Sequence, residues 1–147
     1  MRSIFSMSAV PILVAAAASC LPGCAPPERN LSSQDEVSAL GSREEVMWFL
    51  ATVADPGFKA AANASGGACG DAEFALFADM GRRVPWAASR LQAAGFSAGA
   101  EFDGFARDLA ARAGELLEAA GRKDGPKSVE LALAMKKTCK GCHDVYR

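Results

Sequence analysis

Apolar residues recur at helical spacing through most of the chain after residue 41. The clearest run lies at positions i, i+3, i+4 and i+7, on one face of an amphipathic helix, and consists of Val46, Phe49, Leu50 and Val53. Ser42 stands three residues before Glu45, which is the spacing of a capping box. We therefore predict a helix over residues 42–54, which Pro56 either ends or kinks on the way to residue 63.

Three more stretches carry the same period. They cover residues 71 to about 94, with a kink at Pro85, then about 98–120 and about 127–145. Their predicted apolar faces hold Phe74, Phe77 and Met80, then Phe102, Phe105, Leu109, Leu116 and Leu117, then Val129, Leu133 and Met135. The connections are short, and no segment alternates with period two. The pattern predicts an all-α fold, an antiparallel four-helix bundle.

The first residues have the pattern of an export signal. Arg2 precedes an apolar run at 9–18 that is too short to span a bilayer. Leu21-Pro-Gly-Cys24 is similar to the bacterial lipoprotein signal, in which the cysteine after the cleavage site is lipidated. Cys20 competes for that role, and an ordinary secretory signal is the alternative. We predict a signal peptide at 1–23, a tether and lead-in at 24–41, a bundle domain at 42–147, and a periplasmic protein anchored to a membrane through Cys24.

Charge excludes one class of partner. The 16 basic and 17 acidic residues give a net charge of −1, so the chain has no basic field for nucleic acid. Only one histidine is present, and no nucleophile stands beside a base. We expect neither a nucleic-acid partner nor an enzyme.

The chemistry of the chain is concentrated near its end, in Cys139-Lys-Gly-Cys142-His143. This is the CxxCH pattern by which c-type haem is attached. On a helix the three side chains project from one face, so two thiols can reach the porphyrin edge while the imidazole approaches the iron. We predict one covalently bound haem c with His143 as an axial ligand. A second histidine ligand is impossible within this chain, so the sixth ligand is a Met, another weaker group or nothing.

Three other interpretations of the cysteine pair are weaker. A thioredoxin-type pair needs a strand–helix context that the pattern lacks. A zinc site needs four ligands, and only Cys69 remains in the predicted domain. A disulfide within one helix turn would be strained and would close almost no loop. We expect Cys69 to be a free thiol, with a disulfide-linked dimer as the alternative.

The last nine residues, Cys139 to Arg147, resemble the cytochrome c′ family, the class II c-type cytochromes, in which CxxCH lies near the C-terminus and is followed by Tyr-Arg. The resemblance implies a four-helix bundle, covalent haem, and in many members a homodimer formed through the first helices. It also implies that Arg147 contacts a haem propionate or the proximal side of the iron.

The same resemblance implies two states of the iron. In low-spin relatives a Met from the first helix ligates it, and Met47 has that place here. In high-spin members an apolar side chain of that helix covers the distal face, and Leu50 has that place. Met80 is a more distant candidate, and Met135 should pack on the proximal side. We expect one-electron transfer to or from an unspecified redox partner protein, with binding of a gas such as NO or CO by five-coordinate iron as the alternative.

Overall fold

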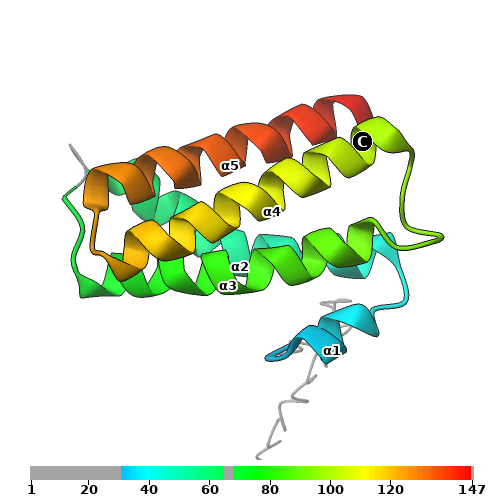
Figure 1. Cartoon of the computed structure of the whole chain (residues 1–147), viewed down its shortest axis with the longest axis horizontal. Helices are drawn as coiled ribbons and strands as arrows, with labels where there is room; N and C mark the ends of the chain where they lie inside the picture. The colour runs from blue at the N-terminus through cyan, green and yellow to red at the C-terminus, as the bar shows by residue number, and fades with distance from the viewer. Residues whose placement is uncertain (1–30, 65–67, 147) are drawn as a thin grey trace, which may run out of the picture.

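The chain folds into a bundle of four long helices with one short helix before it (Figure 1). The computed structural model describes residues 31–64 and 68–146. Within these ranges all regular structure is helical, and the elements are α1 (Gln34–Ser38), α2 (Arg43–Asn63), α3 (Asp71–Leu91), α4 (Ala100–Gly121) and α5 (Gly125–Tyr146). Figure 1 shows α2 to α5 running back and forth along one long axis. The predicted all-α antiparallel bundle is confirmed.

The helix starts follow from local sequence. Ser33 with Glu36 and Ser42 with Glu45 both form complete capping boxes, at the heads of α1 and α2. Pro126 lies in the first turn of α5, where its missing N–H costs nothing. The N-cap of α3 is Gly70, and Asp71 is the first helical residue.

Prolines inside α2 and α3 do not end these helices. α2 continues through Pro56 to Asn63, and α3 continues through Pro85 to Leu91. An internal proline costs about 3 kcal/mol in an isolated helix. The residues around Pro56 are packed into the bundle, with Ala54, Gly57 and Phe58 all buried, and this burial offsets the loss.

The core is built mainly from the predicted faces of α2, α3 and α4. Val46, Phe49 and Val53 are buried on α2, while Leu50 is only partly covered. On α5 the prediction is partly wrong, because Leu133 is 38% exposed and the helix packs through Leu131, Ala132 and Met135. Ala and Leu alternate in this stretch, so two faces compete in the sequence and contacts with the other helices select one.

The described part of the lead-in, residues 31–41, packs on the bundle. Leu31, Val37 and Leu40 are buried in it. Two arginines of α3 hold its backbone: Arg83 Nη2 donates to the Leu31 carbonyl at 2.7 Å, and Arg90 Nη2 to the Leu40 carbonyl at 2.6 Å. The predicted signal peptide, Cys20, Cys24 and residues 25–30 lie outside the described residues.

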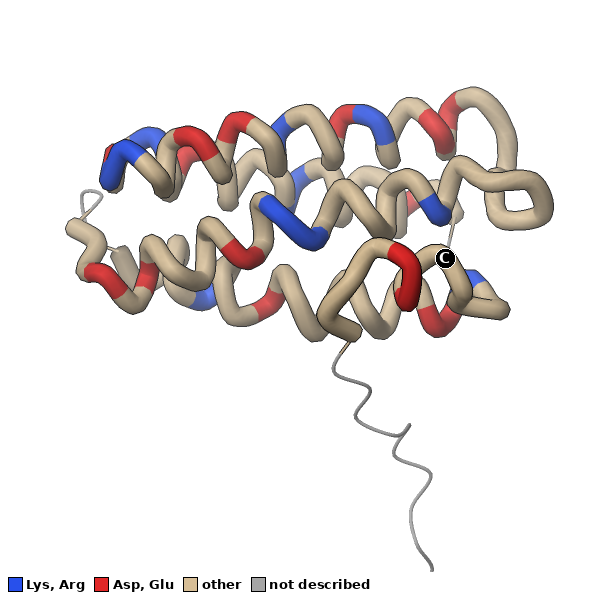
Figure 2. Tube along the Cα trace, turned by 60° about the horizontal axis from the view of Figure 1, so that its bottom comes forward, with Lys and Arg blue, Asp and Glu red and all other residues tan. Residues whose placement is uncertain are grey.

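The surface carries both signs of charge. Figure 2 shows Lys and Arg interspersed with Asp and Glu along the helices. Several of these residues pair with a partner four positions away on the same helix, as Arg112 does with Asp108 and Lys140 with Asp144. In the part of the chain that is described, no helix is both long enough and apolar enough to cross a membrane.

Candidate functional site

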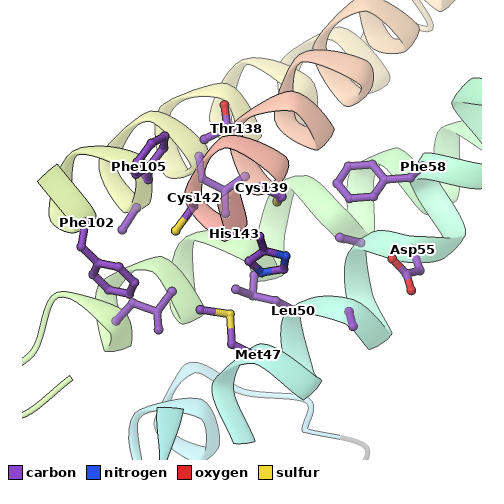
Figure 3. A pocket seen from close by; sticks show the side chains of 15 residues that line it. Met47, Leu50, Asp55, Phe58, Phe102, Phe105, Thr138, Cys139, Cys142 and His143 are labelled. Atoms are coloured by element: carbon purple, nitrogen blue, oxygen red, sulfur yellow. The ribbon is translucent and has the colours of Figure 1, made fainter. Parts of the chain in front are cut away.

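Cys139, Cys142 and His143 lie in the last two turns of α5 and line one pocket (Figure 3). Their spacing puts them on a single helix face, as the sequence analysis predicted. The space between these side chains is about 690 Å³, including the part open to solvent. Its other walls are Met47, Leu50, Ala51, Ala54, Asp55 and Phe58 of α2, Leu91 of α3, and Phe102, Phe105, Ala106 and Leu109 of α4.

The pocket is mostly apolar. Apart from the two thiols, its polar side chains are Asp55, Thr138 and His143. Large side chains, Phe58 and Phe102 among them, line it together with the small side chains of Ala51, Ala54 and Ala106. Such a site suits an apolar group with one ligand atom presented from α5.

Of the methionines considered as iron ligands, only Met47 lines the pocket. Met47 lines the pocket from α2, on the wall that faces α5, and Figure 3 shows its thioether pointing into the space below His143. Leu50 lines the same wall. Met80 and Met135 are fully buried in the core and do not line the pocket. The structure therefore brings Met47 and Leu50, and neither of the other two, together with CxxCH.

Both thiols of the motif are protonated at neutral pH in the protein without haem. Burial raises the pKa of Cys139 to about 11, helped by the nearby Cys142 and Asp55. Burial also raises the pKa of Cys142. A thioredoxin-type pair would need a lowered pKa at its attacking thiol, so this environment does not fit that chemistry. No cluster of three or more metal-ligating side chains occurs among the described residues, which leaves the zinc interpretation without a ligand set.

A contact between α4 and α5, which the sequence analysis missed, supports the motif. The Thr138 hydroxyl donates to Asp108 Oδ2 at 2.6 Å, and Arg112 Nε donates to the same oxygen at 2.8 Å. These two bonds, the Arg112 bond first, hold the pKa of the Asp108 carboxyl below its usual range. Thr138 directly precedes Cys139, so the pair fixes the start of the motif on α4.

A second contact holds the end of the motif. The ring of Tyr146 packs edge-on against Phe102, with centroids 5.3 Å apart, and its hydroxyl donates to Glu101 Oε2 at 3.3 Å. Gly141 lets α5 approach α4 closely, since a Cβ there would lie 3.3 Å from Phe105 Cε1. The glycine within CxGC was the one sequence signal that could have indicated this close approach.

Two other candidates remain. Arg147 lies outside the described residues, so its contact with the haem stays a prediction. Cys69 is a free, half-buried thiol that does not line the pocket, and burial raises its pKa.

Comparison with known proteins gives one match. The sequence profile of the family described as Cytochrome C′ matches residues 51–147, from the third turn of α2 to the end of the chain. The matched range includes CxxCH and begins just after Met47 and Leu50, which it leaves out. No curated protein and no solved structure matches the chain.

Proposed function

This chain belongs to the cytochrome c′ family, and on that premise we propose that it is a periplasmic carrier of single electrons with one covalently bound haem c. Cys139 and Cys142 would form the thioether links, and His143 of α5 and Met47 of α2 would ligate the iron. Covalently bound haem follows from the family. The assignment of individual residues is the proposal.

The residues of the pocket fit such a group. Two thiols and one imidazole stand on one helix face beside an apolar space, and the thiols are in the protonated form before attachment. When bound, the haem supplies an iron that accepts and returns one electron. The chain's part is to hold the group by two sulfurs, to exclude water with Phe58, Phe102 and Phe105, and to present a nitrogen and a sulfur ligand.

One observation carries the choice of electron transfer: the Met47 thioether lies in the pocket wall across from the helix that bears His143. A Met ligand raises the reduction potential of a haem. If His143 and Met47 both ligated the iron, the protein would leave no open position for an exogenous ligand.

The test is the optical spectrum of the purified ferric protein, made in cells with a working haem-ligation apparatus. We expect a mass increased by one haem and a low-spin spectrum with a sulfur-to-iron charge-transfer band. Met47→Leu should convert it to high spin. Met80→Leu is the matched control, since Met80 is buried in the core, lies off the pocket and tolerates a swap that conserves volume.

A second function is favoured by Leu50, which lines the same wall one helical turn after Met47. If Leu50 rather than Met47 covers the iron, the protein binds a small gas at five-coordinate iron. A high-spin ferric spectrum in the unaltered protein, with CO binding after reduction and no response to Met47→Leu, would assign this function instead.

We also propose that the mature protein is tethered to a membrane through lipidated Cys24 and exchanges electrons with a partner protein there. Family members are typically periplasmic, which supports the compartment. Cys24→Ser should release the haem protein into the soluble periplasmic fraction. If the unaltered protein were also found in the soluble periplasmic fraction, the proposed lipid anchor would be wrong.

A further inference from the structure

One side chain of the pocket is chemically unlike the rest. Asp55 is the only carboxylate among the lining residues, and it stands on α2 across the pocket from the helix that carries His143 (Figure 3). Its neighbours in the wall, Ala51, Ala54 and Phe58, are apolar. A charge at such a place is not needed to build the core, since Asp55 itself is exposed to solvent on its other side.

The charge of Asp55 is also uncompensated within the described residues. Lys59 stands four positions on, the spacing at which Asp108 and Asp144 pair with basic residues, yet Asp55 makes no ion pair or hydrogen bond with any described residue. Its field is felt across the pocket, where it contributes to the raised pKa of Cys139 on α5. The negative charge therefore acts on the space between the helices and not on a salt-bridge partner.

A haem centre gains one positive charge when it is oxidised. A fixed negative charge at the edge of an apolar pocket stabilises the more positive state, because Coulomb energy is larger where water is partly excluded. We propose that Asp55 is a counter-charge that favours the oxidised form of the bound haem and so lowers its reduction potential. This inference rests on the proposed haem attachment, and it holds whether or not Met47 is the sixth ligand.

The expected size follows from the partial exposure of Asp55. Solvent and salt screen a charge at the pocket rim, so the effect is smaller than for a fully buried carboxylate. At a fixed ambient potential we expect removal of the charge to lower the ratio of oxidised to reduced protein by roughly threefold to tenfold. For a one-electron couple, tenfold corresponds to about 59 mV.

The experiment is a redox titration of the holoprotein, in which mediators deliver one electron per haem and no atom is transferred. Asp55→Asn should raise the midpoint potential by the amount that corresponds to this threefold to tenfold change in the ratio of oxidised to reduced protein. Asp55→Glu, which restores the charge, should return the potential close to its original value. Glu115→Gln is the matched control: it also removes one carboxylate, from an exposed position about 9 Å along α4 beyond the last pocket residue, Leu109. In this control, the ratio of oxidised to reduced protein at a fixed ambient potential should stay within about twofold of the ratio in the unaltered protein.

A second variant covers the case in which Asp55→Asn does not fold. Ala51 lines the same wall one turn earlier and is exposed, so Ala51→Asp adds a carboxylate there and should lower the midpoint potential. The inference is overturned if Asp55→Asn changes the midpoint no more than Glu115→Gln, or if Ala51→Asp fails to lower it. A protein without covalent haem would instead refute the proposed function.

Discussion

The contact between α3 and α4 and the pocket between α2, α4 and α5 are both rich in small residues, and they are packed in opposite ways. At the first, Gly81 lets the two helix backbones touch: a Cβ at Gly81 would lie 2.7 Å from Leu117 Cβ and 2.9 Å from the Ala113 carbonyl oxygen. At the second, Ala51, Ala54 and Ala106 line an open space.

The difference lies in the neighbours of the small residues. Around Gly81 the nearest atoms of α4 are the Ala113 carbonyl oxygen and Leu117 Cα and Cβ, so the two helices close up and fill the gap. Around the pocket, the bulky side chains of Phe58, Phe102 and Phe105 stand in the wall beside the alanines, and the space between them is not filled. A small residue thus creates either a tight contact or a cavity, and the bulk of the residues beside it decides which.

The largest effect should come from removing the attachment chemistry in the pocket. The double variant Cys139→Ala with Cys142→Ala should lose covalent haem completely, because no sulfur remains to form a thioether. Intact-protein mass and extraction with acidified acetone measure this. Cys69→Ala, which removes a cysteine that does not line the pocket, should keep its haem. Covalent haem in the double variant would contradict the site assignment.

At the tight contact, one added methyl group should be costly. Gly81→Ala forces Cβ against backbone atoms of α4 and should destabilise the protein by about 2 kcal/mol in urea denaturation. Gly114→Ala on α4 is the control. Its Cβ would meet nothing within 4 Å, so the better helix propensity should stabilise by about 0.5–1 kcal/mol. Equal effects of the two variants would show that the close approach is absent.

The buried thiol makes the haem-free protein sensitive to alkali. The pKa of Cys139 is about 11 in the fold against 9.0 for the free group, so the protonated thiol stabilises the fold below pH 9. That stabilisation, roughly 1–2 kcal/mol, is lost as the pH rises from 9 through 11.

Urea titrations at several pH values would measure this loss. Cys139→Ala should reduce the loss between pH 9 and 11, and the holoprotein, in which the sulfur is a thioether, should lack this component. A profile that Cys139→Ala leaves unchanged would count against burial of this thiol.

The smallest change in stability should come from enlarging a pocket alanine. In Ala106→Leu the longer side chain grows into the cavity instead of against backbone, so the free energy of unfolding of the haem-free protein should change by less than about 1 kcal/mol. Haem content, measured by absorbance per protein, should fall because the space is taken. A loss of stability as large as that of Gly81→Ala would mean that the pocket walls are already in contact.

Much of this architecture could be predicted from local patterns. The two capping boxes, the four helical faces and the shared face of CxxCH depend on residues within one or two turns of each other. The prediction failed or stayed open where distant residues compete. The sequence left open whether Pro56 ends the helix or lies within it, and it placed the buried face of α5 partly on Leu133. Both outcomes depend on which residues pack against the helix.

By itself, then, the sequence determined the helices, their order and the group of two thiols and one imidazole, since each is encoded over a short stretch. Only the tertiary structure decided which methionine can face that group, that Asp55 shares its pocket, and that Thr138 and Tyr146 fasten the motif to α4. These are contacts between residues far apart in the chain. They depend on how closely each pair of helices approaches, which is a property of all the side chains between them.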